Sequence, residues 1–369
     1  MSKVFWMTGS SFFDVDEQLV PEMVKKYDVF WFVLVQKNSF YNSSVLEQYL
    51  KDSNVNGVVV NWPRLRSFKS LFLFFKLALH LKKNNYDLVY IDYLGIPYMF
   101  PLFYLLGLHK KKIIYACHDF VDHVEIKKRG FISNYKRFIF RKFPYFQLFS
   151  KTQLSLFSKS YGKKAYYAPL ALKDFGVSKK IKEMSTKTVF LFFGKIQERK
   201  GLEYLIKAAN IVSENYPDKF VVKIFGACKN WDKYKSLIKK ADCFDLNIRR
   251  IENDEIPDIF VNADYLVLPY KDVTQSGPLL ISYNYNVPVI ASNHPGFSEY
   301  IIHEKNGFLF ENCNENSLAE VMINIIKSKY NYNQIKANLS TFIKDNVSLE
   351  SVIDKYDCGF KMVINDGKK

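Results

Sequence analysis

The strongest constraint on the fold is a series of short apolar segments, rich in β-branched and aromatic residues, that alternates with longer stretches of helical spacing. Buried parallel strands have this composition, and a parallel pair needs a helix-length crossover to join it. The pattern therefore predicts βαβ units, and it occurs twice along the chain. The predicted strands are Val29–Val35, Val58–Val60, Leu88–Ile91 and Ile113–Ala116 in the first series, and Val189–Phe193, Val221–Phe225, Tyr265–Pro269 and Val287–Ala291 in the second.

A polar segment between the two series, Tyr161–Ser185, interrupts both periodicities and is typical of a linker. We therefore expect an α/β protein with an N-terminal domain over residues 1–170 and a C-terminal domain over residues 171–345. Each domain is predicted to be a Rossmann-like, doubly wound parallel sheet, and the two to face each other across a cleft. Residues 346–369 are predicted to form closing helices that pack toward the N-terminal domain. Ligands of such sheets bind beyond the carboxyl ends of the strands.

The charge of the chain is unevenly distributed. The 369 residues carry a formal net charge of +16, and residues 1–170 account for +13 of it. Clustered positive charge attracts polyanions, which favours a nucleic acid or an acidic membrane face as a partner. Composition bias is a rival explanation, because 45 of the 53 basic residues are Lys and the chain is also rich in Asn, Ile, Phe and Tyr.

The cysteines and the apolar runs indicate a cellular compartment. Five cysteines lie far apart with no Cys-x-x-Cys pair, so neither a disulfide framework nor a zinc site is predicted. The N-terminus has too short an apolar run for a signal peptide, and no apolar stretch reaches the about 20 residues of a spanning helix. We therefore expect a cytoplasmic protein.

The segment from Val189 to Ala209 is the most informative. It predicts a buried strand, a polar loop that begins at Gly194, and an amphipathic helix. The loop brings Lys195, Arg199 and Lys200 next to the free backbone amides of a helix N-terminus, an arrangement that binds phosphate or diphosphate. Taken alone, a solvated basic loop explains the same residues.

Two further loops follow predicted strands. Gln275, Ser276 and Gly277 stand where a loop turns into a helix, so the amides of Ser276 and Gly277 could bind the same diphosphate from the other side. Glu299 follows the next strand and a glycine-containing loop, where it could accept hydrogen bonds from sugar hydroxyls. Helix capping is the commoner role of such a residue.

In their order and spacing these segments resemble the C-terminal domain of retaining glycosyltransferases of the GT-B architecture, most closely glycosyltransferase family 4 (glycosyl transferases group 1). The resemblance is dense from about Phe190 to Phe310. It is carried by Gly194-Lys195, Lys200-Gly201, Ala263-Asp264 through Pro269-Tyr270, Pro288 through Ala291, and Pro295 through Glu299.

The resemblance implies a nucleotide-diphosphate sugar as donor and hexosyl transfer with retention of configuration. It also implies that no metal or other cofactor is obligatory, and no metal ligand is assigned. Two ammonium groups and helix-end amides can neutralise a leaving diphosphate, which is the role of a divalent ion in other transferases. The donor-binding positions that the resemblance assigns are Gly194, Lys195, Lys200, Gln275, Ser276, Gly277 and Glu299.

The sequence departs from the family in one place. Counting back from Pro288, the two glutamates of the Glu-x7-Glu motif fall on Val273 and Ile281, whose side chains cannot hydrogen-bond a sugar. Asp272 and Gln275 are the candidates to replace the missing contacts. The departure leaves a second interpretation open, a non-catalytic protein of the same fold that binds sugar nucleotides.

In the N-terminal domain a predicted strand ends in His118 and Asp119, at a position that faces the expected cleft. The resemblance implies that His118 corresponds to a family histidine that contacts the donor sugar near the reaction centre. His118 and Asp119 are therefore the predicted catalytic residues. A histidine that only caps the strand is the structural alternative. Gly9 and Ser10, after the first strand, match weakly the glycine-rich turn at which acceptor and donor approach each other.

Two basic segments of this domain, Arg64–Lys83 and Lys127–Lys142, interleave Lys and Arg with Phe, Leu and Tyr, as helices in an anionic membrane interface do. We therefore expect a saccharide or lipid-linked acceptor, a peripheral position on the inner membrane face, and a role in surface polysaccharide biosynthesis. For the first segment, burial in the core is a strong alternative; the second segment is harder to explain that way. Nucleic-acid binding is disfavoured, because arginine is scarce and no RNP, KH or helix-turn-helix pattern occurs.

Overall fold

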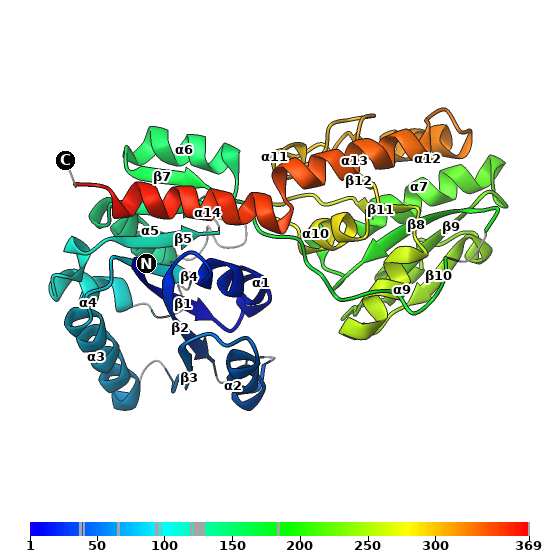
Figure 1. Cartoon of the computed structure of the whole chain (residues 1–369). Helices are drawn as coiled ribbons and strands as arrows, with labels where there is room; N and C mark the ends of the chain where they lie inside the picture. Colours follow the sequence, from blue (N-terminus) through cyan, green and yellow to red (C-terminus); the bar gives the residue numbers. More distant parts are fainter. Residues whose placement is uncertain are drawn as a thin grey trace. The chain divides into compact units, whose positions relative to one another are not determined.

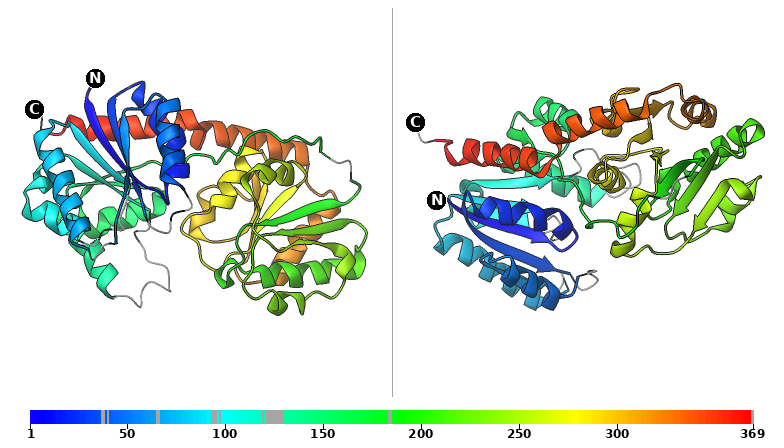
Figure 2. Two further views of the ribbon diagram at one scale, coloured as in Figure 1. Left: turned by 90° about the horizontal axis from the view of Figure 1, so that it is seen from below. Right: turned by 45° about the vertical axis from the view of Figure 1, so that its right-hand side comes forward.

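The computed structural model describes residues 1–36, 39, 41–64, 67–92, 96, 98–118, 120, 130–182 and 185–367. The chain forms two compact units, the first made of Met1–Ala171 with Leu349–Lys369 and the second of Leu172–Ser348. Each unit contains one parallel sheet flanked by helices (Figures 1 and 2). The predicted class, an α/β protein with two Rossmann-like parallel sheets, is confirmed.

The first unit has a seven-stranded sheet in the order β3-β2-β1-β4-β5-β6-β7. Because β1 pairs with both β2 and β4, the strand order reverses there, and the carboxyl ends of β1 and β4 flank the topological switch point. The strands are β1 (Lys3–Gly9), β2 (Asp28–Val35), β3 (Gly57–Asn61), β4 (Leu88–Asp92), β5 (Ile113–Cys117), β6 (Tyr145–Leu148) and β7 (Lys164–Tyr167). The helices are α1 (Phe13–Val24), α2 (Ser43–Asp52), α3 (Phe68–Lys83), α4 (Met99–Leu105), α5 (Gly130–Lys142), α6 (Lys151–Tyr161) and α14 (Leu349–Ile364).

The second unit has a six-stranded sheet in the order β10-β9-β8-β11-β12-β13, with its switch point between β8 and β11. The strands are β8 (Thr188–Phe193), β9 (Phe220–Phe225), β10 (Phe244–Asn247), β11 (Tyr265–Leu268), β12 (Val289–Ser292) and β13 (Gly307–Phe310). The helices are α7 (Leu202–Asn215), α8 (Asp232–Lys235), α9 (Ile256–Val261), α10 (Gly277–Asn284), α11 (Pro295–Ser298), α12 (Glu315–Ile326) and α13 (Tyr332–Asn346).

Central strands of both sheets are buried on both faces, which explains their continuous apolar sequences. In β1, the side chains from Val4 to Met7 are all fully buried, and in β8 those from Phe190 to Phe192 are too. The short strands β6, β7, β10 and β13 lie nearer the sheet edges and are not in the predicted series. β7 lies inside the predicted linker Tyr161–Ser185, so that prediction was wrong over residues 164–167.

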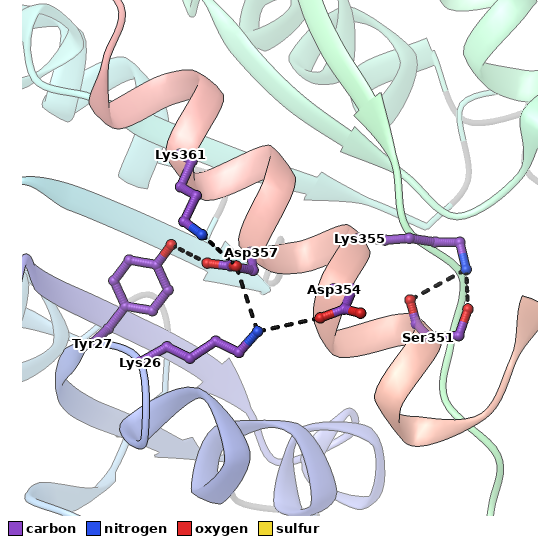
Figure 3. Close-up of polar contacts among 7 residues, drawn as sticks. All are labelled: Lys26, Tyr27, Ser351, Asp354, Lys355, Asp357 and Lys361. Carbon is purple, nitrogen blue, oxygen red and sulfur yellow. Dashed lines mark hydrogen bonds and ion pairs between the residues drawn. The ribbon is translucent and has the colours of Figure 1, made fainter.

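Helix α14 returns the end of the chain to the first unit, where it contacts α1, β4 and β7 (Figure 2). Its polar contacts centre on Asp357, which accepts hydrogen bonds from the Tyr27 hydroxyl at 2.7 Å and from the Lys361 ammonium at 2.8 Å (Figure 3). Lys26 reaches Asp354 at 3.2 Å and Asp357 at 3.5 Å. These contacts hold α14 at two successive turns.

The buried side of α14 is aromatic. Tyr356 stacks on Trp6 of β1 with ring centroids 5.8 Å apart, and Phe360 lies 5.6 Å from the same indole. Gly359 lies between them along the helix, and a Cβ there would be 2.3 Å from the ring of Tyr166. Glycine is therefore needed at this position because the helix approaches β7 closely. Among the described residues, no helix combines the length and the apolar character of a bilayer span.

Candidate functional site

The loop after β8 forms the centre of the candidate site in the second unit. Gly194 has a φ of +101°, and a Cβ there would lie 3.2 Å from the Lys200 Nζ and 3.6 Å from Pro278 Cγ. Pro278 is in the first turn of α10. The missing side chain at position 194 thus lets the Lys200 ammonium and the start of α10 approach the same backbone.

Lys200 is a buried cation, only 7% exposed. Its Nζ lies over the ring of Tyr270 at 5.3 Å from the centroid, and it has no ion pair among the residues that the structure describes. Burial, and then the charge of Arg199, lower the pKa of Lys200 from 10.5 to about 8. A buried ammonium without an anionic partner is unfavourable, so this position favours an anionic ligand.

The loops that follow β8 and β11 are bonded to each other at the switch point. Gly201 has a φ of +60°, and a Cβ there would meet the carbonyl oxygen of Pro269 at 2.0 Å. The amide of Lys271 donates to the carbonyl of Arg199 at 2.8 Å, and its ammonium pairs with Glu203 at 2.5 Å. These contacts fix the backbone on both sides of Lys200.

Helix α10 begins at Gly277 and is capped by Ser276, whose hydroxyl accepts from the amide of Leu279 at 3.4 Å. The Lys173 Nζ lies 3.9 Å from the position of a Cβ on Gly277. Two ammonium groups, of Lys200 and Lys173, therefore lie beside the N-terminal turn of α10, where the helix dipole adds positive potential.

Lys195 is placed differently from Lys200. Its side chain is exposed and lines a pocket of about 380 Å³ together with Lys229 and Lys233. Lys200 is not among the residues that line this pocket. From the sequence, both lysines are expected to bind one diphosphate. In the structure, Lys200 is buried beside Gly194 and Lys195 is exposed.

The position of the missing motif glutamates is apolar in the structure. Val273 and Ile281 are both buried, so neither offers a polar group. Asp272 is half-buried, and its Oδ1 lies 3.7 Å from His294 Nε2. His294 Nδ1 accepts from the amide of Gly296 at 3.3 Å, which leaves the proton on Nε2, toward Asp272.

Gln275 and Glu299 are both half-buried. Gln275 directly precedes the cap of α10, and Glu299 caps the carboxyl end of the short α11. Both therefore lie on loops beyond the carboxyl ends of strands β11 and β12, the edge at which ligands of such sheets bind.

In the first unit, His118 follows β5 and is clamped between two aromatic rings. Its ring stacks on Phe12 and Phe149 at centroid distances of 4.0 and 4.1 Å, nearly parallel to both. Its Nε2 donates to Oδ1 of the buried Asp92 at 2.5 Å. The imidazole is therefore held by stacking on both faces and by its hydrogen bond to Asp92. Asp119 lies outside the described residues.

The turn of Gly9 and Ser10 supports this clamp. The carbonyl of Gly9 accepts from the amide of Phe12, and the amide of Ser10 donates to the carbonyl of Leu34, both at 2.8 Å. Ser10 itself is buried. The turn therefore positions the ring that stacks on His118.

Behind Asp92 lies a second buried carboxyl, Asp16. Its Oδ2 accepts from the Trp6 indole at 2.9 Å and from the Thr8 hydroxyl at 2.5 Å. Burial, and then the charge of Asp92, raise the pKa of Asp16 well above its ordinary value, which favours the neutral form of this carboxyl. Asp14 and Asp16 form an Asp-x-Asp spacing, but the described residues contain no cluster that could hold a metal ion.

Several site residues are not predicted from the sequence. Asp92 could have been found, because β4 and β5 are consecutive predicted strands whose carboxyl ends meet at one edge of the sheet. Arg199 and Tyr270 occur in the motifs, but nothing in the pattern shows that they surround Lys200. Lys173 lies in a polar segment about a hundred positions from Gly277, and no local signal identifies it.

The chain resembles known proteins in sequence and in fold. Residues 176–341 match the family described as Glycosyl transferases group 1. An uncharacterized glycosyltransferase of Methanocaldococcus jannaschii is 24% identical over 335 residues, which cover 84% of this chain and 83% of that protein. An uncharacterized glycosyltransferase of Haemophilus influenzae is 26% identical over 181 residues, 48% of this chain, and the match spans half of that relative's length (50%).

The fold is shared with solved GT-B structures. Alr3699/HepE of Anabaena, solved in complex with UDP and glucose, superposes with a TM-score of 0.72 at 14% sequence identity, over 98% of this chain and 100% of that one. Identity this low shows the likeness of fold alone. The chain is thus similar to glycosyl transferases group 1 in the sequence of its second unit and to a solved glycosyltransferase structure in its fold.

Proposed function

From the GT-B fold and the match of the second unit to glycosyl transferases group 1, we propose that this chain is a retaining, metal-independent glycosyltransferase. It transfers a hexosyl group from a nucleotide-diphosphate sugar to a saccharide or lipid-linked acceptor, in the assembly of a surface polysaccharide. The observation that carries the proposal is the buried ammonium of Lys200 beside Gly194 and the start of α10, which has no ion pair within the described part of the chain.

The diphosphate supplies the anion that Lys200 lacks. Arg199 adds a second positive charge, and Lys173 lies at the capped N-terminus of α10. As the bond to the sugar breaks, negative charge grows on the leaving diphosphate, and cations and amides already fixed in place stabilise it without reorganising. This role makes an obligatory divalent ion unnecessary, so we expect transfer to continue in the presence of a chelator.

His118 is the proposed catalytic residue. Its ring is fixed by two stacking contacts and by Asp92, so it requires little reordering when substrate binds. Gln275, Glu299 and the pair Asp272–His294 are the proposed contacts of the donor sugar and nucleoside, in place of the motif glutamates.

The test is thermal unfolding of the chain with a panel of nucleotide sugars, beginning with UDP-glucose because the structural neighbour was solved with UDP and glucose. A donor stabilises the folded state by mass action, by about 2.7 kcal/mol at a hundredfold excess over its Kd. Lys200→Met should abolish the shift, and Lys195→Met, at an exposed position, should weaken it far less. No shift with any donor would reject the proposal.

A second candidate is a protein that binds sugar nucleotides without turnover. It is favoured by the burial of Val273 and Ile281, where the family has glutamates. The two functions differ in one measurement: a donor that stabilises the chain but is neither transferred nor hydrolysed over a long incubation identifies the binder.

We also propose contact with an anionic membrane surface, supported by the net charge of +16 and its concentration in residues 1–170. A lipid-linked acceptor would be presented at such a surface.

A further inference from the structure

Helix α3 of the first unit has two apolar faces. One face packs in the core through Phe74, Leu77, Ala78 and Leu81. The other is exposed to solvent and consists of large side chains spaced three or four residues apart, so they form one stripe along the helix. The stripe contains Phe68 (94% exposed), Leu71 (39%), Phe72 (58%), Phe75 (41%) and Leu79 (54%).

Lysines run beside this exposed stripe. Lys69, Lys76 and Lys83 recur every seven residues and therefore lie in a row along the helix, and Lys82 extends the stripe at its end. The Lys76 Nζ lies 4.7 Å from the centroid of the Phe72 ring, within the stripe. No acidic residue occurs from Phe68 to Lys83.

An apolar pocket of about 250 Å³ lies on the other side of the lysine row. Its walls come from Phe32 of β2, Val58 and Val60 of the edge strand β3, and Leu73 and Leu77 of α3, and Lys76 also lines it. Trp62 lines it too, with its indole bonded to the Ser70 hydroxyl at 2.8 Å. The pocket is therefore adjacent to both the exposed stripe and the lysines.

The second basic segment exposes no such apolar stripe among the side chains that the structure describes, which begin at residue 133. In α5, the apolar side chains of Tyr135, Ile139 and Phe140 are buried in the core. From the sequence, this segment is favoured over Arg64–Lys83 for membrane contact, because a core helix explains the first segment. The structure instead favours α3 as the membrane-contacting helix, because α3 buries one apolar face and still exposes another.

We propose that α3 binds an anionic lipid bilayer: its exposed stripe enters the interface, its lysines meet lipid phosphates, and the pocket takes a hydrocarbon chain. Charge selects this occupant. A second copy of the chain would bring two lysine rows together, whereas anionic headgroups neutralise them at about 1 kcal/mol per lysine, or about fivefold in affinity. The proposal specifies the membrane contact proposed above and does not depend on glycosyl transfer.

The test is co-sedimentation of the full chain with phosphatidylcholine vesicles that contain or lack phosphatidylglycerol. We expect binding to the anionic vesicles only, and weaker binding at high salt. The double variant Phe72→Ser/Leu79→Ser should lower the partition coefficient about tenfold or more, because it removes two apolar side chains from the interface. Lys76→Gln should lower it about fivefold.

The matched controls lie on α6, beside the opposite edge of the same sheet. Leu156 is 44% exposed and Lys159 is also exposed, so Leu156→Ser and Lys159→Gln remove the same groups outside the stripe. They should sediment like the wild type. The proposal would be overturned if the α6 variants lost as much vesicle binding as the α3 variants, or if the wild type did not sediment with anionic vesicles. It would also be overturned if the wild type were a dimer and the double variant a monomer.

The pocket is tested through Trp62. Phospholipids brominated along the acyl chain should quench the tryptophan fluorescence of the wild type more than that of the Trp62→Phe variant. Equal quenching of the two proteins would show that no acyl chain enters the pocket. Thermal shifts with UDP-glucose separate the two functions. If the α3 variants lose vesicle binding but keep the thermal shift with UDP-glucose, the α3 surface is supported. If the wild type binds vesicles but shows no thermal shift with any donor, only the proposed glycosyltransferase function is rejected.

Discussion

At the scale of single residues, the burial of the charged Lys200 ammonium should lower the free energy of unfolding by a measurable amount. Its pKa is about 8 in the folded chain and 10.5 in the unfolded one. Below pH 8 both states hold the proton, so the folded state bears the full penalty, about 3 kcal/mol. Between about pH 8 and 10.5 the unfolded state binds more protons, so the free energy of unfolding should rise with pH over this window.

Lys200→Met removes the charge and keeps a side chain of similar length. At pH 7 we expect the free energy of unfolding in urea to increase, by up to about 3 kcal/mol, while the stabilisation by nucleoside diphosphate disappears. Lys195→Met is the control, and its exposed position should leave stability within about 0.5 kcal/mol. A Lys200→Met chain less stable than the wild type would show that the ammonium has a structural partner.

The same pKa predicts how donor affinity depends on pH. Diphosphate needs the charged form of Lys200, so calorimetric titration should give a constant Kd below pH 8 and a Kd that rises toward tenfold per unit above it. The phosphates are already ionised in this range and do not contribute. An affinity that is flat to pH 9.5 would exclude Lys200 from the site.

Asp92 fixes the imidazole of His118, so Asp92→Asn tests whether that orientation matters. An amide can donate to Nε2, which favours the other tautomer of the ring. We expect kcat to fall about 10- to 100-fold with unchanged donor affinity, measured as turnover and as thermal shift. A fall in donor affinity with normal kcat would assign Asp92 to the fold rather than to the reaction.

At the scale of elements, the strands that are continuous apolar runs could be predicted, and four short strands with a mixed sequence could not. Strands such as β2 and β8 are continuous apolar runs, which the buried centre of a parallel sheet requires. The strands β6, β7, β10 and β13 have four residues each, and a polar residue or a glycine in each of them shortens the apolar run. The strands β11 and β12 are equally short but fully buried, and they were predicted. The four segments β6, β7, β10 and β13 form strands because each pairs with a neighbouring strand of the sheet.

The candidate site follows the same division. The loop from Gly194 to Lys200 was predicted, because its glycines, lysines and following helix are local. Lys173 and His294, the partner of the predicted Asp272, were not, since they meet the site only through the fold. Burial, which separates Lys200 from the exposed Lys195, likewise depends on the packing around Tyr270 and is not visible in the sequence.

Helix α14 allows a test of close packing. Alanine normally stabilises a helix by about 1 kcal/mol relative to glycine. At position 359 a Cβ would lie 2.3 Å from the ring of Tyr166, so Gly359→Ala should instead destabilise the chain by about 1–2 kcal/mol in urea denaturation. Cys358→Ala, at the exposed neighbouring position, should not destabilise it. Stabilisation by Gly359→Ala would show that Tyr166 moves freely.

At the scale of the whole molecule, the two units differ in how the chain builds them. The second unit is one continuous segment, Leu172–Ser348, whereas the first needs both ends of the chain. Without α14, the Trp6 and Tyr90 side chains would lose their contacts with Tyr356 and Phe360, and Tyr27 its bond to Asp357. The stability of the first unit therefore depends on the last helix, whereas the second unit is built from residues that precede it.

This asymmetry makes truncation after Ser348 informative. Removing α14 deletes several buried aromatic contacts, each worth about 0.5–1.5 kcal/mol beyond the area that they bury, so the first unit should unfold at a much lower temperature. The second unit keeps Lys200, Gly194 and α10, so its unfolding should still shift upward with nucleoside diphosphate. Scanning calorimetry of the truncated chain should thus show two transitions, of which only the upper one responds to nucleotide. A single transition at a lower temperature than in the full chain would mean that the two units unfold together and that α14 stabilises both.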